Sequence, residues 1–141
     1  MKKLFGFMLC LLMIVLCAAA LADVPLDEAH FPDSNFLKCL NWRDSDKDGI
    51  LSDAEIAAVD SIECNLCRIE SLQGIEYFTS LTKLSCSMND LTTLDLSHNT
   101  GLTSVDCSSN ELTSLNISGC SALTVLECLR QRGWEISEEA L

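Results

Sequence analysis

Apolar residues recur at a fixed spacing of 21 residues through the second half of the chain. Leu81, Leu102 and Leu123 each open a unit of the same pattern, L-x-x-L-x-C-x-x-N-x-L-T-x-L-x-L-S, which is complete in the first unit and looser in the later ones. A looser copy of the pattern, around Ile62, stands 22 residues before the first unit. A fixed period in this range predicts a solenoid, in which each unit is one coil that cannot bury its apolar side chains alone.

Each unit also holds a shorter near-copy of itself, so that segments of ten and eleven residues alternate. Stacked coils would carry parallel strands about 4.8 Å apart, with alternate side chains turned inward. Equivalent residues would then form ladders along the solenoid axis. We predict a cysteine ladder at Cys64, Cys86, Cys107 and Cys128. We predict an asparagine ladder at Asn89 and Asn110, where side-chain amides would satisfy backbone groups of the loops.

The segment before the repeats has a helical pattern on both sides of an aspartate-rich loop. Residues 31–40 predict a short helix, because Pro32 and Asp33 suit its start and its apolar residues share one face. Ser52-x-x-Glu55 is typical of a capping box and predicts a second helix. The expected order is therefore helix, loop, helix, solenoid.

The loop between these helices, residues 44–55, matches the pattern D-x-D-x-D-G-x₅-E. Calcium prefers six to eight oxygen ligands, and alternate carboxylates on a tight turn at Gly49 can supply them. Leu51 would anchor the loop to its helix. The alternative is an acidic, turn-rich loop without metal. The predicted ligands are Asp44, Asp46, Asp48, the backbone carbonyl of Ile50, Ser52 through a water, and Glu55 through two oxygens.

Two resemblances follow from these patterns. Residues 44–55 resemble an EF-hand loop, present once, whereas EF-hand proteins and dockerin modules usually carry two. Residues 60–128 resemble the short leucine-rich repeats of secreted bacterial proteins, including the internalin-like group. That resemblance implies an α/β solenoid, a right-handed coil of about 3.5 turns with parallel strands, and a concave face that binds a partner. The alternative is a plain solvated face. The outward residues of this strand face, which would meet the partner, are Glu63, Asn65, Ser85, Ser87, Asp106, Ser108 and Glu127.

The first 22 residues read as a secretory signal peptide. Lys2 and Lys3 precede an apolar stretch, and Ala20-Leu21-Ala22 fits the small-x-small cleavage pattern. The alternatives are an uncleaved membrane anchor and lipid attachment at Cys17. If the peptide is cleaved, we expect no membrane span in the mature protein. The expected organisation is a signal peptide at 1–22, a helix–calcium loop–helix cap at 23–59, repeats at 60–128, and an irregular tail or truncated repeat at 129–141.

Charge and cysteine content narrow the possible functions. The net charge is −12, and −14 without the two signal-peptide lysines, which argues against nucleic acid and anionic membrane surfaces as partners. Seven of nine cysteines follow the signal, an odd number that cannot pair fully within one chain. Buried cysteine behaves as a small hydrophobe, and we prefer that interpretation of the ladder. Zinc or redox work at Cys64-x-x-Cys67 is the weaker alternative.

No constellation of residues predicts catalysis. His30 and His98 suit surface roles, and no nucleophile motif occurs. We therefore expect a secreted or cell-surface protein that is not an enzyme. It would be a calcium-binding leucine-rich-repeat module for protein–protein or surface recognition, adhesion-like, with structural calcium and an unknown protein or glycan as partner. The rival interpretation is a dockerin-like or accessory fragment of a larger secreted enzyme or surface protein.

Overall fold

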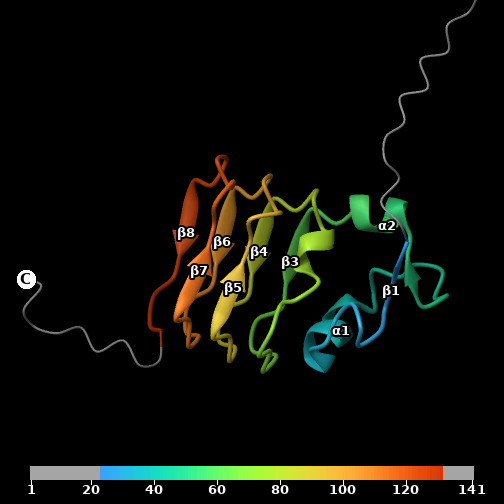
Figure 1. Ribbon diagram of the computed structural model, residues 1–141, viewed down its shortest axis with the longest axis horizontal. Helices are drawn as coiled ribbons and strands as arrows, with labels where there is room; N and C mark the ends of the chain where they lie inside the picture. Colours follow the sequence, from blue (N-terminus) through green and yellow to red (C-terminus); the bar gives the residue numbers. More distant parts are fainter. Residues whose placement is uncertain (1–22, 132–141) are drawn as a thin grey trace, which may run out of the picture.

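A computed structural model describes residues 23–131 of the chain. The expected signal peptide and residues 132–141 of the expected tail lie outside the described residues. Figure 1 shows a short helical segment at one end, followed by a stack of parallel strands. The elements are β1 (Val24–Pro25), α1 (Ser34–Leu40), β2 (Ile50–Leu51), α2 (Asp53–Ala57), β3 (Ser61–Glu63), η1 (Ile75–Tyr77), β4 (Lys83–Ser85), β5 (Thr93–Asp95), β6 (Ser104–Asp106), β7 (Ser114–Asn116) and β8 (Val125–Glu127).

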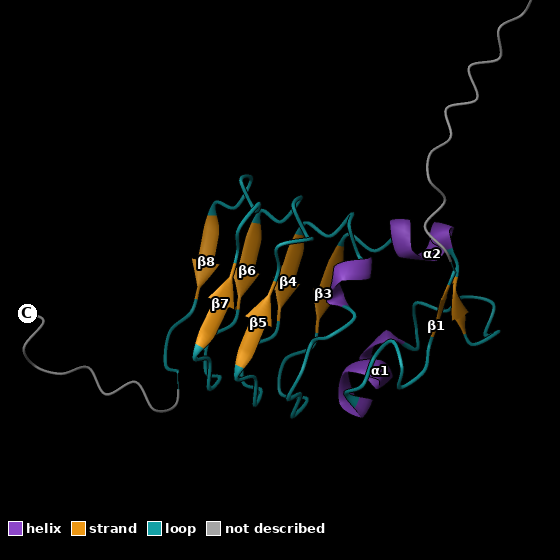
Figure 2. Ribbon diagram, viewed as in Figure 1, coloured by secondary structure: helices purple, strands orange, loops and turns teal. Residues whose placement is uncertain are grey.

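The predicted repeat period is confirmed by the strand register. β3, β4, β6 and β8 form one parallel sheet, in which Ile62 pairs with Leu84, Leu84 with Val105, and Val105 with Leu126. β5 and β7, from the shorter near-copies, form a second parallel pair (Figure 2). The repeats therefore build a parallel-strand solenoid of about three turns.

The cysteine and asparagine ladders are both present. Cys64, Cys86 and Cys107 are buried one above another along the core, while Cys128 is half-buried. Asn89 is buried, donates from Nδ2 to the carbonyls of Cys64 and Cys86 at 2.8 and 2.9 Å, and accepts from two backbone amides of the preceding coil. A buried amide that bridges two coils in this way satisfies backbone groups that water cannot reach.

The hydrogen bonds of the asparagine ladder continue into the next coil, where a glutamine makes them. Asn110 donates to the carbonyls of Cys86 and Cys107, and Gln131 donates to Cys107 and accepts from the amide of Leu112. Gln131 lies in the segment where the repeat pattern of the sequence ends, yet it makes the bonds of a ladder asparagine. Before each ladder position the backbone takes a positive φ, at Leu66, Met88, Ser109 and Arg130.

The two helices before the repeats begin at side-chain caps. α1 starts at Ser34, with Asp33 as its N-cap, rather than at Phe31. Phe31 instead lies in the core beside Phe36 and Phe78, with ring centroids 6.1 and 6.4 Å away. α2 starts after Ser52, where the predicted capping box with Glu55 is formed.

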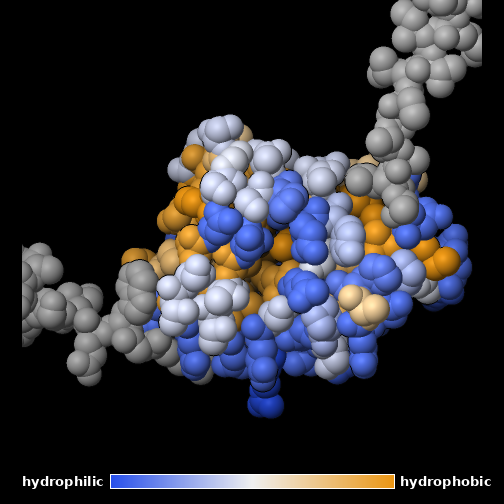
Figure 3. All heavy atoms as spheres, viewed as in Figure 1, coloured by the Kyte–Doolittle hydropathy of each residue, from blue (hydrophilic) through white to orange (hydrophobic). Residues whose placement is uncertain are grey.

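The last described coil exposes apolar side chains. Val125 and Leu126 of β8 are 44% and 42% exposed. Leu84 and Val105, which occupy the position of Leu126 in the preceding coils, are buried. Figure 3 shows hydrophobic residues on the surface at this end of the solenoid. Within residues 23–131, no helix has the length and hydropathy needed to cross a bilayer.

Candidate functional site

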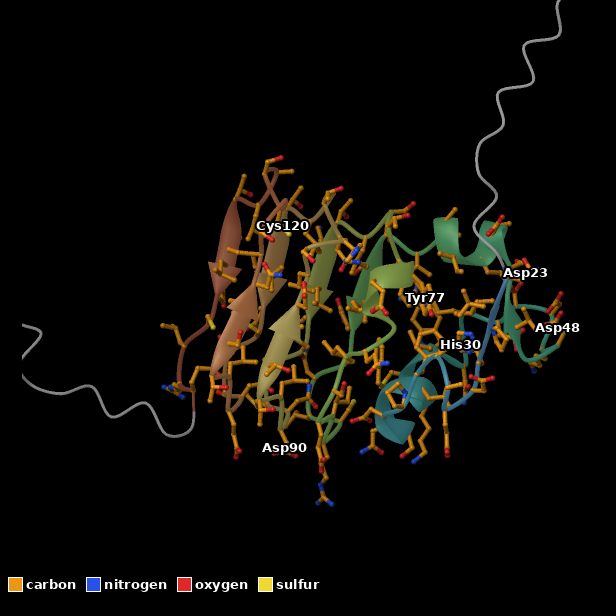
Figure 4. The ribbon with its side chains drawn as sticks, viewed as in Figure 1. Asp23, His30, Asp48, Tyr77, Asp90 and Cys120 are labelled. Carbon is orange, nitrogen blue, oxygen red and sulfur yellow. The ribbon has the colours of Figure 1, made fainter. Side chains whose placement is uncertain are left out.

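The three aspartates at the start of the predicted calcium loop lie together. Carboxylate oxygens of Asp44, Asp46 and Asp48 lie within 4.8 Å of one another. Figure 4 shows Asp48 at the outer end of its loop, on the side away from the repeats. Hard oxygen donors at this separation suit calcium, which takes oxygen ligands at about 2.3–2.6 Å.

Backbone amides shape the loop around Asp44. Its Oδ1 accepts from the amides of Lys47 and Asp48 at 2.7 and 3.2 Å, and its Oδ2 accepts from Gly49 at 2.9 Å. Gly49 has a φ of +84°, a conformation that side chains other than glycine rarely adopt. Asp44 is also buried, so the loop is folded around its first predicted ligand.

Glu55 is held by hydrogen bonds instead of joining this aspartate cluster. Its Oε1 accepts from the amide and hydroxyl of Ser45, both at 2.6 Å, and its Oε2 accepts from the amide and hydroxyl of Ser52 at 3.0 and 2.9 Å. The bonds from Ser45, then those from Ser52, lower the pKa of Glu55 to about 2. The structure therefore gathers three predicted ligands and turns Glu55 and Ser52 toward each other and the loop backbone.

The surroundings of Asp46 in the cluster shift its pKa. The amide of Asp48 lowers the pKa of Asp46, but partial desolvation and the carboxylates of Asp48 and Glu55 outweigh it, so that the net shift is upward. Like charges gathered in one turn disfavour ionisation, and a divalent cation among them would relieve that repulsion.

The N-terminal segment supports this loop, which the sequence pattern did not indicate. Val24 pairs with Leu51 and Pro25 with Ile50 in the antiparallel β1–β2 ladder, and the amide of Leu26 donates to the carbonyl of Gly49 at 3.0 Å. EF-hand loops usually occur in pairs. Here a two-residue strand pairs with the residues at the seventh and eighth loop positions, and the only advance signal was the apolar character of Val24 and Leu26.

The α1 seam, which joins α1 to the first coil, is built by Asp33 and Asn35. Asp33 Oδ1 accepts from the first-turn amides of Asn35 and Phe36, while its Oδ2 accepts from Glu70 and Ser71 at 2.7 and 3.1 Å. Asn35 Nδ2 donates to the carbonyl of Arg68 at 3.0 Å. The sequence predicted Asp33 at the helix start, but its bonds to a segment 37 residues away had no sequence signal.

The predicted partner face is a continuous row on the β3–β4–β6–β8 sheet. Register aligns Glu63 with Ser85, Ser85 with Asp106, and Asp106 with Glu127. Beside this row, Asn65 Oδ1 accepts from the hydroxyls of Ser85 and Ser87 and from the amide of Ser87. The hydroxyl of Ser108 accepts from the amide of Leu129. The row is acidic at three strands and partly ordered by its own hydrogen bonds.

The two histidines lie apart from both of these sites. His30 Nδ1 is 2.7 Å from Asp27 Oδ1, and its ring centroid lies 6.2 Å from that of Tyr77. Figure 4 shows His30 and Tyr77 near each other, between the helical segment and the repeats. His98 lines a hollow of about 370 Å³ beside η1 and β5, together with Glu76 and Asp95. Ser97 Oγ lies 3.3 Å from His98 Nδ1 in an exposed contact, but the residues that line this hollow do not include Ser97.

Comparison with known proteins gives one consistent relationship. No protein-family model matches the chain. Over 73 residues the chain is 40% identical to internalin J of Listeria monocytogenes serotype 4b (strain F2365), a match that covers 49% of this chain and 8% of internalin J. The solved functional domain of InlJ from Listeria monocytogenes, which includes a cysteine ladder, matches with a TM-score of 0.70 and 34% identity.

The structural match covers 83% of this chain and 26% of the InlJ chain, so the chain spans only a small part of these relatives. The shared repeats support an internalin-like leucine-rich-repeat protein and a parallel-strand solenoid. The cysteine ladder predicted from the 21-residue period has its counterpart in that solved domain.

Proposed function

We propose that this protein is an exported, calcium-binding leucine-rich-repeat module that acts in protein–protein or surface recognition. The observation that carries the calcium assignment is the gathering of the Asp44, Asp46 and Asp48 carboxylates within 4.8 Å in a loop with the complete EF-hand pattern. The recognition role rests on the similarity of the repeats to internalin J. The row of outward residues on the long sheet is the surface that would meet the partner.

Calcium in this proposal is structural. The ion would be held by Asp44, Asp46 and Asp48, by the carbonyl of Ile50, and by Glu55 after it turns from Ser45. It would neutralise the charges that raise the pKa of Asp46. Because the same loop pairs with β1 and leads directly into α2, the ion would order the end of the molecule that covers the first coil.

Calorimetric titration of the protein, freed of metal with a chelator, tests the calcium site. We expect one site with a dissociation constant of about 10⁻⁴ to 10⁻³ M, the range of extracellular modules. Asp44→Ala should abolish the heat, while Asp23→Asn, which removes an exposed carboxylate outside the loop, should leave it unchanged. Absence of heat at millimolar calcium, or equal binding by Asp44→Ala, would refute the assignment.

Glu55→Gln refines the same test. The amide keeps one oxygen, which can accept from Ser45 or from Ser52 but not from both, and it gives up the charge and one ligand oxygen. If Glu55 closes the calcium shell, affinity should fall at least tenfold. If affinity is unchanged, calcium is held by the aspartates alone and Glu55 acts only as a cap.

The recognition role requires a separate experiment. Chemical crosslinking on the outer surface of the source cells, with and without calcium, should yield a protein or glycan partner. The variant Asp106→Asn with Glu127→Gln should weaken capture, whereas Thr93→Ala on the other sheet should not. Capture of a cohesin-like domain would favour the rival, dockerin-like interpretation. Turnover of a glycan or peptide would overturn the assignment as a protein without catalytic activity.

A further inference from the structure

Two cysteines outside the ladder meet between the helical segment and the first coil. Cys39 lies near the end of α1, and Cys67 lies in the turn that follows β3. Their Sγ atoms are 3.6 Å apart, and both side chains are half-buried. The ladder thiols differ in their surroundings, since Cys64, Cys86 and Cys107 are buried in the core.

The position of Cys67 in the repeat explains why its thiol faces α1. Each ladder side chain donates to the carbonyl of the coil before it: Asn89 to Cys64, Asn110 to Cys86 and Gln131 to Cys107. Cys67 occupies the equivalent position in the first coil, and among residues 23–131 no earlier coil offers it a carbonyl. Its sulfur is instead directed to Asn65 O at 3.1 Å and to Cys39 on the neighbouring helix.

Other contacts already hold the two backbones together. The α1 seam places Asn35 against Arg68 and Asp33 against Glu70 and Ser71, beside the cysteine pair. Bond formation would bring the sulfurs from 3.6 Å to about 2.05 Å. Side-chain rotation can supply an approach of about 1.6 Å without moving α1 away from the coil.

We propose that Cys39 and Cys67 form a disulfide that fixes α1 covalently to the first repeat coil. The reaction is exchange with a small-molecule disulfide of the oxidised-glutathione class. One cysteine thiolate attacks that disulfide and releases one thiol; the second cysteine then attacks the mixed disulfide and releases the other. The pair loses two electrons and two protons, and the small disulfide is reduced to two thiols. Extracellular surroundings supply such oxidants.

The bond would enclose the predicted calcium loop. Cys39 and Cys67 are 28 residues apart, and residues 44–55 lie between them. Closing this segment restricts the unfolded chain in the region that calcium would order in the folded one. The proposal does not depend on calcium, because the contacts that hold the pair lie at the α1 seam.

Disulfide mapping tests the proposal on the full chain, with chelator present. After equilibration with oxidised and reduced glutathione, free thiols are blocked and the protein is digested with trypsin. Cys39 falls in the peptide 39–43, and Cys67 shares the peptide 48–68 with Cys64. We expect these two peptides to be linked in the wild-type protein and in Cys64→Ala. Loss of the link in Cys64→Ala, or thiols that all stay free, would overturn the proposal.

A thermal melt in chelator gives the second readout. Reductant should lower the melting temperature of the oxidised wild-type protein by about 10 °C, a shift that follows from closing a loop of this length in a domain of this size. Cys39→Ser should melt at the lower temperature and be insensitive to reductant, while Cys120→Ser, at a buried position after the turn that follows β7, should keep the sensitivity. Equal sensitivity of Cys39→Ser would overturn the proposal. Because both readouts are made without calcium, a failed calcium titration leaves them unaffected.

Discussion

Asp33 links the helical segment to the repeats, so its removal should weaken the whole molecule. In Asp33→Ala, Asn35 and Phe36 lose the N-cap acceptor, which is worth about 1 kcal/mol. The amides of Glu70 and Ser71 also lose their acceptor, at about 0.5–1.5 kcal/mol each. We expect the free energy of unfolding to fall by roughly 2–4 kcal/mol, a large part of the stability of a small domain.

Urea unfolding followed by circular dichroism, in chelator, measures this loss. Asp27→Ala is the matched control, because Asp27 accepts from the amides of Ala29 and His30 within its own turn and contacts no repeat. It should cost less than about 1 kcal/mol. If Asp33→Ala destabilises no more than Asp27→Ala, the α1 seam does not couple the helix to the solenoid and the reasoning is refuted.

The same carboxylate predicts the direction of a pH effect. Burial would raise the pKa of Asp33, but the amides of Phe36, Glu70, Ser71 and Asn35 outweigh it and lower that pKa. A carboxyl with a lowered pKa in the folded state stabilises the protein above its unfolded pKa, about 3.9, and loses that contribution as the pH falls through the folded value. The difference between wild type and Asp33→Ala should therefore be constant above about pH 5 and shrink below about pH 4.

Three further perturbations have definite expected outcomes. Asn89→Ala leaves buried amides and carbonyls of two coils unpaired and should lower the free energy of unfolding in urea by about 3–5 kcal/mol. Exposed Asn65→Ala should lower it by less than about 1 kcal/mol, and equal losses would contradict the role of the ladder. Gly74→Ala, at a φ of +100° and with the new Cβ 2.8 Å from His30 O, should lower the melting temperature further than Gly49→Ala, whose Cβ meets nothing within 4 Å. As the pH is lowered, calcium affinity measured by titration should begin to fall before the pH reaches about 4, because the pKa of Asp46 is raised and protonation of Asp46 removes a ligand. Constant affinity down to about pH 4 would contradict the role of Asp46 as a ligand.

The repeats were predictable because their stabilising contacts are periodic. The 21-residue spacing fixed which residues stack, and the observed pairing of Leu84 with Val105 and of Val105 with Leu126 follows it. The asparagine ladder was predictable for the same reason. The ladder role of Gln131 was not predictable, because a glutamine reaches the equivalent carbonyl, that of Cys107, without matching the asparagine of the repeat pattern.

The helical segment was predictable only in its local features. The capping box of Ser52 and Glu55 and the N-cap of Asp33 depend on neighbours within three residues. The pairing of Val24 with Leu51 and the approach of Cys39 to Cys67 join residues 27 and 28 positions apart without any repeat to set their register. Such contacts depend on how the segment lies on the first coil, which no spacing in the sequence records.

The unequal burial of the four stacked strands makes the stability of this molecule directional. Along the sheet, Ile62, Leu84 and Val105 are 3%, 2% and 0% exposed, and Leu126 is 42% exposed. Within residues 23–131, β8 pairs with one strand and β4 and β6 pair with two, and a coil with fewer contacts opens at a lower free-energy cost. Amide hydrogens of β8 should exchange with solvent first and those of β3 and β4 last, so that local opening begins at one end and progresses toward the helices.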